Sequence, residues 1–161
     1  MRIHGKKKRY IKIHFAVDVK TEEILAMEIT MDDVHDSEAL PALIEKASRR
    51  RIIDEAIMDG VYDSSKVYRL LKRMGIKPII KPRRNARLDG SPPERLRAVR
   101  LIRTHRNKEW SKLMNYGRRW MTETAFSTFK HLYGEYCMAK SIQNIESEFI
   151  ANRGDSQTIK N

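Results

Sequence analysis

The chain has 161 residues, and its 33 Lys and Arg outweigh 21 Asp and Glu, so the formal net charge is +12. A positive excess of this size favours a polyanionic partner, most simply nucleic acid. No apolar run approaches the length of a membrane span, and the single cysteine, Cys137, excludes an internal disulfide, which favours a cytoplasmic setting.

The N-terminal part of the chain predicts a β-hairpin followed by a helix. Residues 1–9 are basic and fit either a frayed arm or the start of a strand. Residues 10–18 and 23–30 are rich in strand-forming side chains, so they predict two antiparallel strands. We interpret the acidic residues 31–36 as a helix start rather than a metal site. The helix then spans residues 37–50, with Asp36 or Ser37 as N-cap and an apolar face of Leu40, Leu43, Ile44 and Ala47.

The next apolar segment, residues 52–58, predicts a strand that ends at Asp59 and Gly60. A strand that ends in an acid presents a carboxylate at a sheet edge. From the local sequence alone, Asp-Gly could equally well serve only as a turn.

A helix and an edge strand are predicted to follow. Residues 65–74 have helical periodicity, with Asp63 as the expected N-cap and Gly75 as the end. Residues 76–83 predict a strand, and Pro78 favours the edge of a sheet for it.

Basic residues dominate the middle of the chain. A loop rich in Pro and Gly follows the basic segment 81–87, and residues 94–106 predict a helix with five arginines. A solvated helix is one reading of this pattern. Five arginines within about three turns repel one another unless an anion is near, so we expect a phosphate-tracking surface. Its expected DNA contacts are Arg97, Arg100 and Arg103.

Residues 116–130 predict a helix with two faces. At ~100° per residue, Ala125, Phe126 and Phe129 lie on one apolar stripe. A different face carries a carboxylate among cations and a phenol, an arrangement that also fits an ordinary solvated surface. Its members are Tyr116, Arg119, Glu123 and Lys130.

The spacing of these four residues, Y-(2)-R-(3)-E-(6)-K, resembles the signature of bacterial and archaeal insertion-sequence transposases with a DDE site. Residues 4–9, 12–18 and 58–64 resemble further segments of that family, in the same order. The resemblance covers about residues 4–150, so we expect a partial catalytic domain over residues 1–150 and a disordered tail over residues 151–161. A final amphipathic helix is expected at residues 142–150.

The resemblance implies an α/β fold, with a ribonuclease-H-like mixed sheet flanked by helices. It implies that Asp59 and Glu123 are catalytic and hold Mg²⁺ (or Mn²⁺), and that Tyr116, Arg119 and Lys130 lie at the DNA. The family's first catalytic Asp precedes the segment that residues 4–9 resemble, so we expect the first strand and its Asp to lie before Met1. Asp18 is the alternative within the chain.

The implied activity is Mg²⁺-dependent strand cleavage and transfer at the ends of an insertion sequence. The partner would be double-stranded DNA at the element ends and the target, with a homodimer on DNA as one arrangement and a nucleoid-associated location. Two alternatives remain open, a DNA-binding remnant without catalysis and a metal-dependent nuclease of the same fold.

Overall fold

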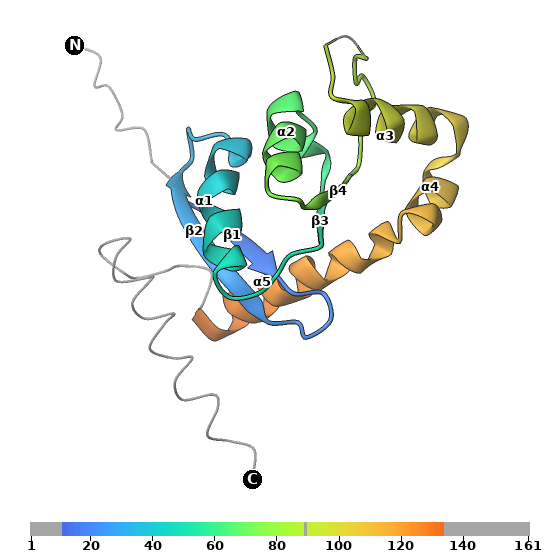
Figure 1. The fold of residues 1–161 in the computed structure, drawn as a ribbon. Coiled ribbons are helices and arrows are strands. Elements are labelled where there is room, and N and C mark those ends of the chain that lie inside the picture. Colours follow the sequence, from blue (N-terminus) through green and yellow to red (C-terminus); the bar gives the residue numbers. More distant parts are fainter. Residues whose placement is uncertain (1–10, 89, 134–161) are drawn as a thin grey trace, which may run out of the picture.

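The structure is a computed structural model that describes residues 11–88 and 90–133. It is a mixed α/β arrangement with two small sheets (Figure 1). Strands β1 (Ile11–Val17) and β2 (Ile24–Met31) form an antiparallel hairpin, and β3 (Glu55–Met58) pairs in parallel with β4 (Lys77–Ile80). No helix among the described residues is long and apolar enough to cross a membrane.

Helices cover both faces of the hairpin. Helix α1 (Asp36–Ser48) packs on one face, where its Leu43 and Ala47 meet Leu25 and Ala26 of β2. Helix α5 (Trp120–Tyr133) packs on the other, where Phe129 contacts a cluster formed with Met27, Ile29, Ile13 and Phe15. The two faces follow from the alternation of side chains along a strand, except at Leu25, where the register of the hairpin is irregular.

The β3–β4 pair is joined by helix α2 (Ser65–Arg73), which forms a parallel β-α-β unit. Ala56 and Met58 are alternate residues of β3, and both are buried against α2 and α1. Val67 and Leu71 of α2 are almost completely buried in the same core, as the helical spacing of the sequence predicts.

A buried ion pair anchors helix α3 (Pro93–Thr104) to this unit. The Arg95 guanidinium donates from Nε to Oδ1 of Asp63 at 2.7 Å and from a terminal nitrogen to Oδ2 at 3.1 Å. The other terminal nitrogen donates to the Arg87 carbonyl and to Ser91 Oγ, both at 2.6 Å. Asp63 also accepts from the Arg83 backbone N–H at 2.9 Å. The Asp63–Arg95 pair therefore holds together the turn before α2, the segment after β4 and helix α3.

The predicted N-caps of two helices are wrong. Asp63 does not cap α2, because its side chain is fully buried against Arg95, and the Ser64 hydroxyl accepts from the Val67 N–H instead. Neither Asp36 nor Ser37 is the N-cap of α1, because His35 holds that position and its ring nitrogen accepts from the Ser37 N–H.

The predicted continuous helix over residues 116–130 is also wrong. Residues Tyr116–Arg119 form a short 3-10 turn, η2, and the α-helix begins at Trp120. Asn115 precedes η2 in the left-handed region, with φ 48°, which breaks the path from the preceding helix. That helix, α4 (Asn107–Leu113), had no counterpart in the sequence prediction and is anchored by buried Trp110.

The strands form two separate sheets rather than the single mixed sheet that was expected. Among the described residues, β1 pairs only with β2, and β3 pairs only with β4. The helix expected at residues 142–150 and the tail at residues 151–161 lie outside the described part of the chain.

Replacing Asp63 with Ala should lower the free energy of unfolding by about 3 kcal/mol, because it leaves a buried guanidinium without its counter-ion. Lys72→Ala is the matched control, since Lys72 joins α2 to α3 through an exposed ion pair with Glu94 at 2.8 Å. Urea denaturation followed by circular dichroism measures both. Equal losses in the two variants would show that the Asp63–Arg95 pair has no special role.

Candidate active site

Asp59 lies directly after β3 and begins a 3-10 turn, η1 (Gly60–Tyr62). One of its carboxylate oxygens accepts from the Val61 N–H at 2.9 Å, while the side chain stays 42% exposed. Gly60 follows because a Cβ there would lie 3.2 Å from the Lys81 carbonyl oxygen, closer than most side chains tolerate. The Asp-Gly pair thus makes a turn and also leaves a carboxylate open at the end of the strand.

Arg119 brings Asp59 together with Glu123. One terminal nitrogen of its guanidinium lies 2.6 Å from Oε1 of Glu123, and the other lies 4.0 Å from Oδ2 of Asp59. Glu123 is in the first turn of α5 and is two-thirds exposed. The carboxylates of Asp59 and Glu123, which are far apart in sequence, therefore share the Arg119 guanidinium.

Tyr116 lies beside this group and packs on the ring of Trp110, with ring centroids 5.1 Å apart. Burial is the main cause that raises the pKa of Tyr116; Arg119 opposes the shift, while Asp59 and Glu123 add to it. The phenol therefore stays protonated at neutral pH. The fourth residue of the motif, Lys130, lies in α5, and its side chain is outside the described part of the structure.

Sequence analysis missed a second ion-pair group next to the first. Arg118 donates to Oε2 of Glu55 at 2.9 Å, and Lys77 donates to Oε1 of the same residue at 2.7 Å. These hydrogen bonds, from Lys77 first and then Arg118, lower the pKa of Glu55. The polar residue at the start of an apolar strand was the only signal available. The adjacent residues Arg118 and Arg119 therefore pair with different acids, Glu55 and Glu123.

The carboxylates fit a single hard cation better than a pair of them. Mg²⁺ accepts one or two protein carboxylates and completes its shell with water and substrate phosphate. Asp59 and Glu123 could supply two such ligands. No group of three or more acidic, His or Cys side chains suited to a metal exists in the part of the chain that the structure covers.

Asp18, the alternative first acid, lies just after β1 in the hairpin turn. Its carboxylate accepts from the backbone N–H groups of Lys20 and Thr21 and pairs with Arg51 at 2.9 Å. The Lys20 N–H is the leading cause that lowers the pKa of Asp18. These bonds hold Asp18 in the hairpin turn, and Asp18, Asp59 and Arg119 line one cleft between the two sheets.

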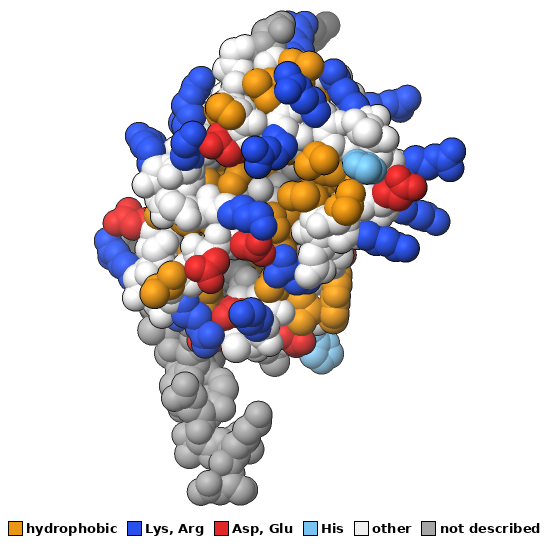
Figure 2. Space-filling model, turned by 45° about the vertical axis from the view of Figure 1, so that its right-hand side comes forward, with side chains coloured by type: hydrophobic (Ala, Val, Ile, Leu, Met, Phe, Trp, Pro, Cys, Tyr) orange, Lys and Arg blue, Asp and Glu red, His pale blue; other side chains and the backbone are white. Residues whose placement is uncertain are grey.

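Not all of the arginines on the predicted basic helix are exposed without a bond to the rest of the molecule. Arg97 and Arg100 are exposed and border a groove of about 410 Å³ along α3. Arg103 is exposed but donates to the Ala86 carbonyl at 2.9 Å, and Arg95 is buried. Figure 2, in which the side that carries α3 and α4 is turned forward, shows that Lys and Arg side chains predominate over acidic ones on this face.

Residues 1–152 match the model of the protein family described as "Transposase DDE domain". The match spans every residue that the structure describes, including both carboxylates of the Arg119 group. No solved structure matches the chain.

Replacing Arg119 with Gln should tighten binding of Mn²⁺ about fivefold. A unit charge about 4 Å away is worth about 1 kcal/mol in water, and removing it favours a cation between the two carboxylates. Free Mn²⁺, measured by electron paramagnetic resonance during a titration, gives the dissociation constant.

Arg118→Gln is the matched control, because it removes the same charge one residue away but from a guanidinium that pairs with Glu55. The same gain in both variants would mean that Mn²⁺ responds to net charge and not to the Arg119 group.

Proposed function

Because the chain belongs to the transposase DDE domain family, we propose that it is the catalytic domain of an insertion-sequence transposase that acts on double-stranded DNA. The observation that carries this proposal is the meeting of Asp59 and Glu123 at Arg119. The two carboxylates come from the end of a strand and from a distant helix, which is how a phosphoryl-transfer site is assembled.

The proposed fold is of the ribonuclease-H-like type. Three features support it: an antiparallel hairpin, a helix across its face, and then a parallel β-α-β unit. In this arrangement Asp59 follows the strand next in sequence to α1, so its carboxylate is presented at a sheet edge.

We assign the chemistry to the carboxylates and cations of this one site. Asp59 and Glu123 would hold Mg²⁺, which supplies charge neutralisation at the phosphate and activation of the attacking oxygen. Arg119 would move from the carboxylates to the scissile phosphate, and Tyr116 would pack beside the DNA end. Water attack at phosphorus breaks the P–O3′ bond and leaves a 3′ hydroxyl. That hydroxyl would then attack a phosphate of the target strand, which joins it to the 5′ side of the target and displaces the target's own 3′ oxygen as a hydroxyl.

A second candidate function is DNA binding without cleavage. It is favoured by the number of ligands, since the described residues bring two carboxylates to the site and not three. Two carboxylates give a pair of divalent ions too few fixed ligands and too little compensating charge. The two candidates share the DNA surface and differ only in catalysis.

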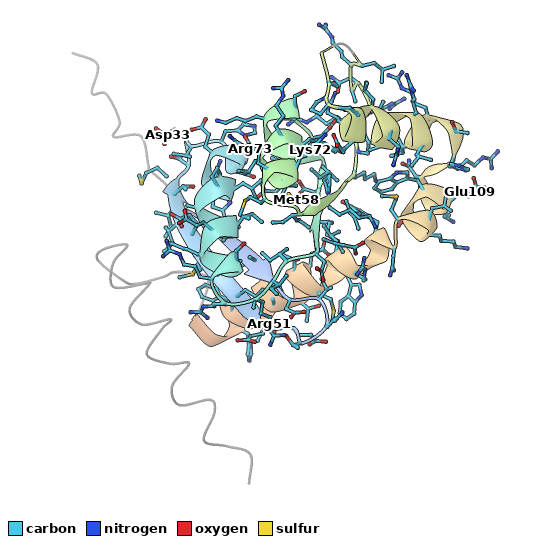
Figure 3. The ribbon with its side chains drawn as sticks, viewed as in Figure 1. Asp33, Arg51, Met58, Lys72, Arg73 and Glu109 are labelled. Carbon is cyan, nitrogen blue, oxygen red and sulfur yellow. The ribbon has the colours of Figure 1, made fainter. Side chains whose placement is uncertain are left out.

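Nicking of supercoiled plasmid distinguishes them. The transposase proposal expects slow nicking that requires Mg²⁺ and falls at least a hundredfold in Asp59→Asn and in Glu123→Gln. Asp33→Asn is the control, because Asp33 is exposed at the far edge of the molecule (Figure 3). Binding without any nicking would support the remnant, and nicking that survives both substitutions would overturn the assigned site.

The DNA surface is tested by salt dependence. The logarithm of the association constant falls with the logarithm of salt concentration, by about 0.9 per neutralised phosphate. Replacing Arg97 and Arg100 together with Gln should make this slope shallower by about 1 to 2. Lys20 and Arg50, which are exposed and lie outside α3, give a charge-matched control when replaced by Gln. Equal slopes in the two double variants would remove α3 from the DNA path.

A further inference from the structure

Turn η2 packs against β3, and charged side chains line the contact. Glu55 and Asp59 point to this face of the strand, because side chains alternate along β3 and the alternate residues are buried on the other face. At about 3.3 Å per residue, the two acids are about 13 Å apart along the chain. From η2, Arg118 pairs with the first of them and Arg119 reaches the second. This face of β3 therefore carries two acids, each with its own arginine.

Glu55 holds Arg118 with one carboxylate oxygen while the other oxygen is held in turn. Lys77, the partner of Glu55 in the β3–β4 register, donates to Oε1 at 2.7 Å, and Arg118 donates to Oε2 at 2.9 Å. The Nε of Arg118 also donates to the Asn115 carbonyl at 3.1 Å. The side chains of Glu55 and Arg118 are each 30% exposed, so their pair is less screened by solvent than a fully exposed one.

Without Glu55, Arg118 would have other carboxylates as partners. Its Cα is about 3.8 Å from that of Arg119, whose guanidinium is shared by Asp59 and Glu123. These two acids are 42% and 66% exposed, which leaves oxygen surface for a second cation. A second guanidinium there would repel a metal ion and would occupy oxygens that the ion needs as ligands.

We propose that Glu55 is a positioning residue of the candidate site, which holds Arg118 away from Asp59 and Glu123. The inference rests on the proposed function, because it takes these two carboxylates as ligands of a divalent cation. With one guanidinium between them, the two carboxylates keep a net negative charge that attracts the cation. A second guanidinium would cancel that charge. Glu55 thus keeps the site open to metal by binding the neighbouring arginine.

Binding of Mn²⁺ in the absence of DNA, followed by electron paramagnetic resonance of the free ion, tests the proposal. Glu55→Ala should weaken this binding about fivefold, the effect of one unit charge brought close to a carboxylate in water. Arg118→Gln alone should leave the dissociation constant unchanged, because Glu55 already holds that cation. The double variant Glu55→Ala/Arg118→Gln should regain the affinity of the wild-type chain.

Asp54→Ala is the matched control, since Asp54 is exposed and carries the same charge directly before Glu55. Equal weakening by Asp54→Ala and Glu55→Ala would overturn the proposal, because Mn²⁺ would then respond to net charge alone. Weakening that persists in the double variant would also overturn it. The cause would then be a displaced η2 and not a competing guanidinium, since both variants lack the same ion pair.

Nuclear magnetic resonance of the arginine Nε–H groups gives a second readout that needs no metal. In the wild-type chain, Glu123→Gln should shift the Arg119 signal and leave the Arg118 signal in place. In the Glu55→Ala background, Glu123→Gln should shift both signals. An Arg118 signal that ignores Glu123→Gln in both backgrounds would overturn the proposal.

Failure of the proposed function has a different signature. A chain that shows the expected Mn²⁺ cycle and nicks no plasmid would support the role of Glu55 and contradict transposase activity. Nicking that requires Asp59 and Glu123, together with a cycle in which Arg118→Gln restores nothing, would support the function and overturn the role of Glu55.

Discussion

The buried pair of Asp63 and Arg95 is the constraint on which the arrangement around the candidate site depends. Asp63 closes the turn that begins at Asp59, and Arg95 is the point where α3 reaches into the core. The carboxylate also holds the Arg83 backbone, and Arg83 in turn donates to the carbonyls of Gly60 and Val61. The position of Asp59 is thus set by a network and not by its own strand alone.

Some of the basic side chains behind the net charge of +12 form ion pairs or hydrogen bonds within the molecule and are not part of a free surface. Of the arginines on α3, Arg95 is internal and bound to Asp63, whereas Arg97 and Arg100 are exposed. Arg103 is also exposed and donates one hydrogen bond to the Ala86 carbonyl. Adjacent Arg118 and Arg119 serve separate acids in the same way. A basic chain uses part of its charge to hold itself together.

A cleft of about 640 Å³ lies between the two sheets, and Asp59, Arg118 and Arg119 are among the residues that line it. The cleft and the candidate site therefore belong to one region of the molecule.

The sequence by itself determined the elements whose signal is periodic and local. Runs of strand-forming side chains predicted the hairpin, and helical spacing predicted the buried faces of α1 and α2. The motif spacing singled out Tyr116, Arg119 and Glu123. Only the tertiary structure decided that Asp63 is an ion-pair partner and not a cap, and that a 3-10 turn precedes α5. It also decided that Arg119 spans two acids and that the strands form two sheets with a cleft between them. Apart from the 3-10 turn, these features join residues distant in sequence, and local patterns carry no information about which charges or strands will meet.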